Sequence, residues 1–93
     1  MQTALLKYDI NQVFEMLPLV CSKNNYTIRE INIENKIIRA RKGRFLFSGK
    51  LELELRVLKL DNEILNIGVK ILKNGTPQKD LEEKFVNSIY NFF

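Results

Sequence analysis

The segment KLELELRV at residues 50–57 is the feature that most constrains what this chain can fold into. Apolar residues alternate with charged ones through most of it. In an extended strand, successive side chains point to opposite faces, so this alternation predicts a strand with one buried face and one face in water. The segment therefore indicates an antiparallel sheet that is covered on one side only.

A second alternating segment follows at 63–73, and Asp61-Asn62 predicts the turn between the two strands. A turn of three residues, 61–63, would place Val57 opposite Ile67 and align the apolar residues of both strands. The residues expected to pair in this way are Leu53 with Ile71, Leu55 with Val69, and Val57 with Ile67.

The N-terminal part predicts a short strand at about 3–8 and then a helix. Asp9 can cap this helix, and Gln12 at the third helical position completes a capping-box pattern. Pro18 interrupts the apolar stripe and is expected to kink or split the helix, because it removes a backbone hydrogen bond. The helix is expected to end at residues 23–25.

Four strand-like segments and a second helix follow. The strands are expected at about 26–34, 36–42, 45–60 and 63–73. Asn74-Gly75 closes the last strand, Thr76 is expected to cap the helix, and Pro77 is expected at its first position, where proline is well tolerated. The apolar stripe of this helix consists of Leu81, Phe85, Ile89 and Phe92.

These elements predict one α+β domain spanning residues 1–93. The expected architecture is a two-layer sandwich with topology β-α-β-β-β-β-α. Its five-stranded antiparallel sheet has the order 1-5-4-3-2, and both helices cover one face.

Basic residues concentrate in one segment, 36–50, which contains six cations and no acid. Because the whole chain carries +4, the other residues sum to −2. The charge thus indicates a local patch and not a uniformly basic domain. The residues predicted as possible anion-binding groups are Arg39, Arg41, Lys42 and Arg44.

The turn inside this basic segment can be placed in two ways. A turn at residues 41–44 pairs Ala40 with Phe45 and Ile38 with Phe47, which makes both aromatic rings part of the core. A turn at Ser48-Gly49 would place the two rings on the outer face beside Arg39 and Arg41, as a surface for stacking and phosphate binding. The first is favoured, because the second turns Lys42 and Arg44 inward, which costs desolvation energy.

The order of elements resembles the TATA-binding-protein-like and helix-grip-like architectures. It is also similar to the small C-terminal domains of the outer-membrane assembly lipoprotein BamC and to several uncharacterised bacterial families. The first resemblance implies DNA binding by phenylalanines on the open sheet face. Only the Ser48-Gly49 turn would put Phe45 and Phe47 there. The lipoprotein resemblance implies a partner-binding module.

The residue types argue against an enzyme. The chain has no histidine, which removes most acid–base, triad and zinc-site designs. Cys21 lies on an apolar helix stripe and is expected to be a core residue. Glu52 and Glu54 lie about 7 Å apart on one strand face and are expected to be part of a wet surface. We expect no metal and no cofactor.

The composition also bears on the compartment. A single cysteine cannot form an internal disulfide, and no apolar run approaches the roughly 18 residues of a membrane span. A cytoplasmic protein without a membrane span is therefore expected. The content of lysine, asparagine and isoleucine, with ten of each, is typical of AT-rich genomes.

Three functions remain open. The sequence favours a small protein-interaction or structural module, with itself or another protein as partner. Binding of a nucleic acid or another polyanion through the basic hairpin 39–47 is the alternative. Binding of a small apolar ligand between sheet and C-terminal helix is a third possibility. The residues predicted for a protein interface are Leu58, Leu60 and Ile64 on the open sheet face and Val86, Tyr90 and Phe93 on the C-terminal helix.

Overall fold

Strands and helices follow one another in the predicted order. The computed structural model describes residues 2–43, 50–61 and 63–93. Five strands form one antiparallel sheet in the order β1-β5-β4-β3-β2, and a short sixth strand pairs with β5. The elements are β1 (Gln2–Leu6), α1 (Ile10–Lys23), β2 (Thr27–Asn32), β3 (Ile37–Lys42), β4 (Leu51–Lys59), β5 (Leu65–Lys73), β6 (Thr76–Pro77) and α2 (Lys79–Phe92).

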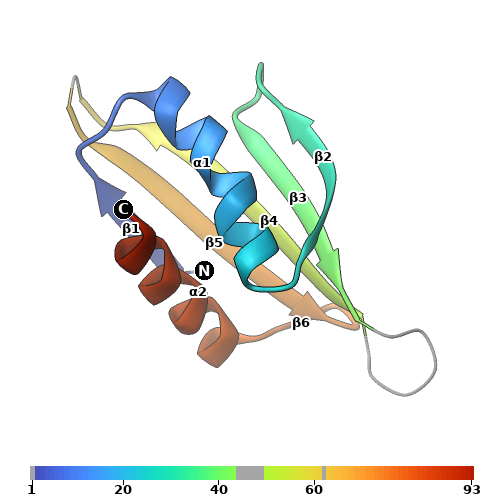
Figure 1. Cartoon of the computed structure of the whole chain (residues 1–93). Helices are drawn as coiled ribbons and strands as arrows, with labels where there is room; N and C mark the ends of the chain where they lie inside the picture. The colour runs from blue at the N-terminus through green and yellow to red at the C-terminus, as the bar shows by residue number, and fades with distance from the viewer. Residues whose placement is uncertain (1, 44–49, 62) are drawn as a thin grey trace.

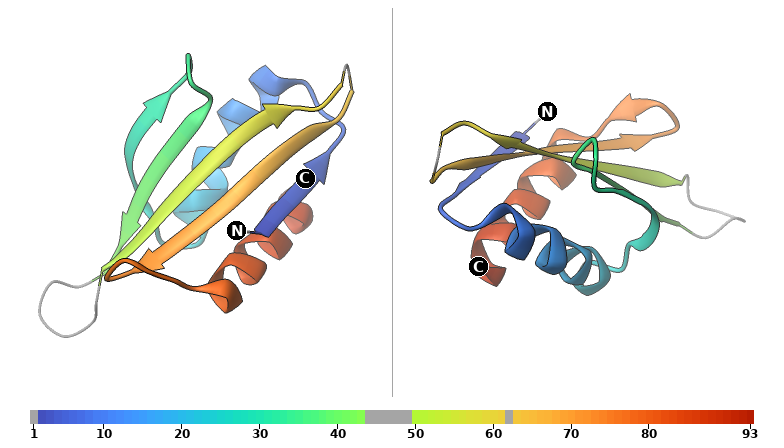
Figure 2. Two further views of the ribbon diagram at one scale, coloured as in Figure 1. Left: turned by 180° about the vertical axis from the view of Figure 1, so that it is seen from behind. Right: turned by 90° about the horizontal axis from the view of Figure 1, so that it is seen from above.

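Both helices pack on the same face of the sheet, which confirms the two-layer α+β prediction (Figure 1). Seen from above, the sheet forms one layer and the helices the other (Figure 2, right). The core lies between them, and no helix of the described residues covers the opposite face of the sheet. Core residues contributed by the sheet include Ala4, Ile38, Leu53, Leu55, Ile67, Val69 and Ile71, and those from the helices include Val13, Leu17, Val20, Phe85 and Ile89.

The pairing of β4 with β5 confirms the register predicted from the alternation. Val57 lies opposite Ile67, and the two further pairs expected from the sequence are also found. Asp61 builds the turn, because its carboxylate oxygen accepts hydrogen bonds from the backbone N–H groups of Glu63 and Ile64. Asn62, the other predicted turn residue, lies outside the described residues.

The favoured register of the β3–β4 hairpin is wrong. Ala40 pairs with Leu53 and Ile38 pairs with Leu55, so β4 begins at Leu51 and not at residue 45. Both registers keep the same residues on the inner face, and the alternation alone therefore cannot distinguish them. The observed register places the apolar row of β4 directly beside that of β3. The predicted core positions Phe45 and Phe47, and the alternative turn at Ser48-Gly49, lie outside the described residues.

The first helix is continuous. Asp9 caps it by accepting a hydrogen bond from Asn11 N–H, and the helix runs through Pro18 without splitting. Leu17 and Val20 are fully buried on either side of the proline. Their packing against the sheet holds the helix together where one backbone hydrogen bond is missing.

The second helix begins later than predicted. Asn74 and Gly75 both adopt positive φ angles, of 51° and 83°, and form a two-residue turn between paired strands. Thr76 and Pro77 therefore continue as β6, and Gln78 precedes the helix without a side-chain cap. The dipeptide Asn74-Gly75 strongly favours a hairpin turn. The hairpin forms here instead of a helix that begins at Pro77.

Within the described residues, neither helix has the length and apolar character needed to cross a bilayer.

Candidate functional site

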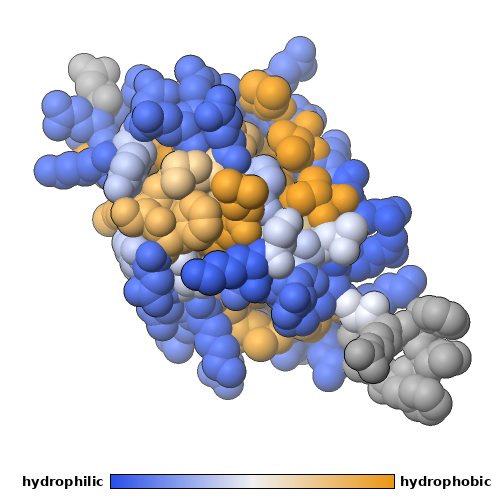
Figure 3. Space-filling model, in the orientation of Figure 1, coloured by the Kyte–Doolittle hydropathy of each residue, from blue (hydrophilic) through white to orange (hydrophobic). Residues whose placement is uncertain are grey.

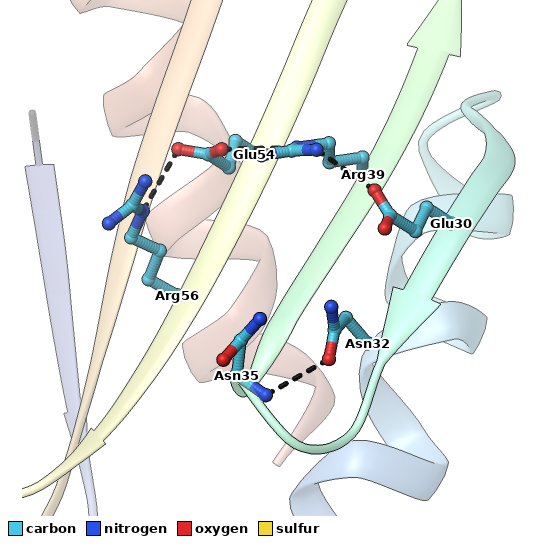
Figure 4. A network of polar contacts seen from close by, with 6 residues as sticks. All are labelled: Glu30, Asn32, Asn35, Arg39, Glu54 and Arg56. Carbon is cyan, nitrogen blue, oxygen red and sulfur yellow. Dashed lines mark hydrogen bonds and ion pairs between the residues drawn. The ribbon is translucent and has the colours of Figure 1, made fainter.

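The uncovered face of the sheet carries a network of ion pairs (Figure 4). Arg39 Nη1 lies 2.9 Å from Glu30 Oε1, and its Nε lies 3.2 Å from Glu54 Oε1. Arg56 Nε donates to the other oxygen of Glu54 at 3.0 Å. The network thus crosses β2, β3 and β4 and engages both oxygens of the Glu54 carboxylate.

These contacts change the proton affinity of the groups involved. Partial burial of Glu54 favours its protonated form, but the hydrogen bonds from Arg56 and Arg39 outweigh this and hold the pKa of its carboxyl below the usual range. The same contacts raise the pKa of the Arg39 guanidinium. Both groups are therefore charged at neutral pH, and they form an ion pair with each other.

A β-bulge in β2 changes which residues face outward. The pairing with β3 shifts by one residue between Ile28 and Glu30, which makes Arg29 the extra residue of the bulge. Arg29 lines the outer surface beside Arg41. Because Ile28 pairs with the buried Ala40, alternation from Ile28 already turns Arg29 outward, and the bulge lets Glu30 face outward as well, where it pairs with Arg39.

The C-terminus of α1 positions the start of β2. Asn25 has a positive φ of 66°, Asn25 N–H donates to Ser22, and Tyr26 N–H donates to Cys21, which is the Schellman arrangement. Tyr26 is buried against the core, and Lys42 Nζ lies 5.3 Å from the centre of its ring. Asn25 and Thr27, on either side of Tyr26, line the surface next to Lys42.

These elements enclose a basic hollow of about 760 Å³ at one end of the sheet. Four cations line it, contributed by β2, by the end of β3 and by the residue preceding β4, and no acidic residue is among its described lining residues. Polar groups and a glycine complete the wall. The basic hollow is lined by Asn25, Thr27, Arg29, Arg41, Lys42, Gly43 and Lys50.

A second, smaller hollow of about 300 Å³ adjoins the first on the uncovered face, and the two share Arg29 and Arg41. Its chemistry differs, because two carboxylates and two leucines lie among its cations. This mixed hollow is lined by Arg29, Arg39, Arg41, Glu52, Leu53, Glu54, Lys70 and Leu72.

The predicted anion-binding residues separate into two groups. Arg41 and Lys42 line the basic hollow, while Arg39 is held in the ion-pair network and lines the mixed hollow. Arg44 lies outside the described residues. Sequence reasoning missed Arg29 because it lies outside the basic segment 36–50, and it counted Lys50 in that segment without assigning it to the site.

The predicted interface residues on α2 do not form an exposed patch. Val86 is 8% exposed and belongs to the core, so its assignment to an exposed group was wrong. Phe93 packs against Phe92 and against Tyr8, whose ring centre lies 5.1 Å away. Tyr90 is 47% exposed, and its hydroxyl accepts a hydrogen bond from Leu5 N–H.

The predicted interface residues at the end of the sheet are more accessible. Leu58 is 60% and Leu60 is 53% exposed, while Ile64 is half-buried. Leu5, which the sequence analysis did not include, is 53% exposed and lies in the same row as Leu58, with Asn66 between them. We call Leu5, Leu58 and Leu60 the leucine end.

Further apolar groups lie on the helix side. The space-filling view shows apolar surface over the helices and along β2, broken by hydrophilic side chains (Figure 3). Leu19 on α1 is 55% exposed, and Ile31 and Ile33 in and after β2 are 46% and 65% exposed.

Two further residues with ionisable side chains, Cys21 and Glu82, are buried in the core. Cys21 is fully buried, and this burial raises the pKa of its thiol to about 12. Glu82 is 1% exposed on α2, and its Oε2 accepts a hydrogen bond from the backbone N–H of Ile71. It ties α2 to β5 at a point between the residues that pair with β1 and those that pair with β6. Sequence reasoning missed Glu82, although it has helical spacing with the buried Phe85 and Val86.

Core side chains occupy the region where an apolar ligand was expected. Phe85, Val86 and Ile89 of α2 are buried in the same cluster as Val69 and Ile71 of β5. The two hollows described above lie elsewhere, at one end of the sheet and on its uncovered face. The apolar-ligand prediction thus gains no support from this packing.

Comparison with models of known protein families finds no match to this chain, and no curated protein matches it either.

Proposed function

We propose that this domain is a non-enzymatic binding module that holds the phosphate backbone of a nucleic acid at the basic hollow. The observation that carries the proposal is the convergence of Arg29, Arg41, Lys42 and Lys50 on one hollow whose described lining contains no acid. Sequence reasoning ranked this function behind a protein-interaction module. The position of Arg29 beside Arg41 and the observed hairpin register support it more strongly.

The lining suits phosphate chemically. Arginine and lysine neutralise phosphates, and contacts of this kind supply most of the sequence-independent affinity for nucleic acids. Asn25 and Thr27 add side-chain groups that hydrogen-bond phosphate oxygens. Arg29 and Arg41 form no ion pair with any described residue, in contrast to Arg39. Their charge is therefore available to a ligand.

The non-enzymatic part of the proposal rests on the surroundings of the reactive groups. A nucleophilic cysteine needs a lowered pKa and access to solvent, and Cys21 has neither. Both oxygens of Glu54 accept hydrogen bonds from arginines. These bonds keep the carboxylate ionised and occupy the oxygens that a catalytic acid or base would use.

Binding of a fluorescently labelled single strand of about twenty nucleotides, followed by anisotropy, tests the proposal. We expect binding at 50 mM salt that weakens steeply as salt rises. For four phosphate contacts the logarithmic slope is about −3 on a single strand, from about −0.7 per contact. Arg29→Ala with Arg41→Ala should weaken binding and make the slope less negative by about 1.4.

The matched control is Lys7→Ala with Lys59→Ala. It removes the same charge at the opposite end of the sheet, where Lys59 pairs with Leu65 and Lys7 directly follows β1. A short-range site predicts a much smaller effect for this control. Equal effects of the two double variants would mean that binding depends on the net charge of the protein and not on the basic hollow. Absence of binding by the wild type at 50 mM salt would remove the proposal.

A second candidate, self-association, is favoured by the leucine end. Three leucines that are each more than half exposed at one end of an uncovered sheet face form an unusual surface for a monomer. Light scattering at tens of micromolar should then report a dimer, and Leu58→Lys with Leu60→Lys should return a folded monomer. A wild type that stays monomeric at millimolar concentration would exclude the homodimer.

A further inference from the structure

The two hollows are parts of one continuous surface. Arg29 and Arg41 line both of them, so one ligand can contact the basic hollow and the mixed hollow together. The basic hollow offers cations and the polar side chains of Asn25 and Thr27, with no acid among its described lining residues. The mixed hollow adds carboxylates and the apolar side chain of Leu72, which lies opposite Glu52, and a simple phosphate chain requires neither.

The two carboxylates of the mixed hollow are not equivalent. Glu54 is 17% exposed, and its oxygens already accept hydrogen bonds from Arg39 and Arg56. Glu52 is exposed and lies opposite Arg41 in the strand pairing, yet it forms no hydrogen bond or ion pair with the residues described here. Glu52 is therefore the acceptor that remains available to a ligand.

An ionised carboxylate only accepts hydrogen bonds, so its partner must donate. Among the parts of a nucleic acid, the exocyclic amino groups of the bases are such donors, and carboxylates accept from the N4 amino group of cytosine. Thymine presents a carbonyl at the same position, which a carboxylate repels. A carboxylate beside a phosphate site thus rejects some bases more than others.

The size and lining of the mixed hollow suit a single base. About 300 Å³ is at the lower end of ligand pockets, so it takes a small planar group and not a duplex. The guanidinium planes of Arg29, Arg39 and Arg41 offer surfaces on which an unpaired base stacks. Glu52 lies on the wall of the same hollow.

Building on the function proposed above, we infer that the ligand carries an amino-bearing base joined to phosphate, with phosphates in the basic hollow and the base in the mixed hollow against Glu52. The base must be unpaired to enter, so the ligand is a single strand or a free nucleotide, and cytosine is accepted ahead of thymine or uracil.

The test compares labelled oligo(dC) and oligo(dT) of equal length by anisotropy, at pH 7.5 and a fixed 50 mM salt. We expect oligo(dC) to bind about fivefold more tightly. Glu52→Gln should bring the ratio of the two affinities close to one, because an amide both accepts and donates. It should also strengthen oligo(dT) binding, because it removes a negative charge and adds a donor.

Glu15→Gln on α1 is the matched control, since it removes one carboxylate on the opposite side of the molecule and should leave the preference intact. Competition with cytidine monophosphate separates the two sources of the ligand. Displacement of oligo(dC) at micromolar concentrations identifies a nucleotide site, whereas displacement only at millimolar concentrations identifies a single-strand site.

The outcomes separate this inference from the proposed function. Equal affinities of the wild type for the two oligonucleotides, or a preference that survives in Glu52→Gln, would overturn the base-reading role and leave backbone binding intact. Failure of both oligonucleotides to bind would remove both proposals.

Discussion

The two faces of the sheet are built on different principles. On the face covered by the helices, Leu53 and Leu55 of β4 are buried beside apolar partners on both neighbouring strands. The uncovered face is turned toward the viewer in Figure 2 (left). On this face, Glu52 and Glu54 alternate with these leucines along the same strand. One residue step along β4 thus separates a water-free environment from a charged one.

The comparison shows what residue type alone determines. Burial of the inner row follows from hydrophobicity, because the hydrophobic effect stabilises any register that keeps the leucines inward. The outer row depends on which charges become neighbours. That depends on the bulge at Arg29 and on the hairpin register, so Glu54 becomes engaged and Glu52 does not.

The largest expected effect is on the inner face. Leu55→Ala should lower the free energy of unfolding by about 2–5 kcal/mol, because it leaves a cavity at a fully buried position. Arg56→Ala, one residue along on the outer face, is its control. Urea unfolding measures both. Similar losses for the two variants would mean that both faces are packed, and the two-layer description would fail.

A smaller loss is expected for Glu82, a charged residue on the covered side. Glu82→Ala should cost about 1–3 kcal/mol, because Ile71 N–H loses its hydrogen-bond acceptor in a buried place. Glu83→Ala, at an exposed neighbouring position, should cost little. If the two substitutions cost the same in urea unfolding, Glu82 does not tie α2 to β5.

The strand registers and the bulge in β2 show how much of the structure could be predicted from the sequence. The alternation of β4 and β5 predicted their register and a sheet with one buried face, because hydrophobic burial acts at every second residue. The order of elements along the chain predicted the strand order. It did not predict the β3–β4 register, since both registers bury the same row. It also did not predict that Arg29 and Glu30 both face outward, because a bulge interrupts the alternation between Ile28 and Glu30. The geometry of the candidate site depends on the β3–β4 register and on the bulge in β2. The sequence therefore predicted the basic character of the site but not the arrangement of its residues.

The ion-pair network should produce a modest dependence of stability on pH. The pKa of Glu54 is lowered in the folded protein, so its contribution to stability is present above the ordinary pKa of a glutamate carboxyl and is lost as pH falls through the lower folded pKa. The stability difference between wild type and Glu54→Gln, measured by urea unfolding, should shrink on acidification from pH 7 to pH 3. A difference that stays constant over this range would show that the network does not stabilise the fold.

The smallest expected stability effect is at the basic hollow. Arg41→Ala with Lys42→Ala should change the free energy of unfolding by less than about 1 kcal/mol, as changes at partly exposed charges usually do. The same variant should bind single-stranded DNA more weakly and with a smaller salt dependence. A loss of several kcal/mol in urea unfolding would assign these residues a structural role.

The most direct test of the account is an NMR titration of the ¹⁵N-labelled protein with single-stranded oligo(dC). The account predicts that amide shifts change at the basic and mixed hollows, around Thr27, Arg29, Arg41, Lys42 and Glu52, while α1 and α2 stay unperturbed. Shift changes confined to the helices or to the leucine end, or none at saturating oligonucleotide, would contradict it.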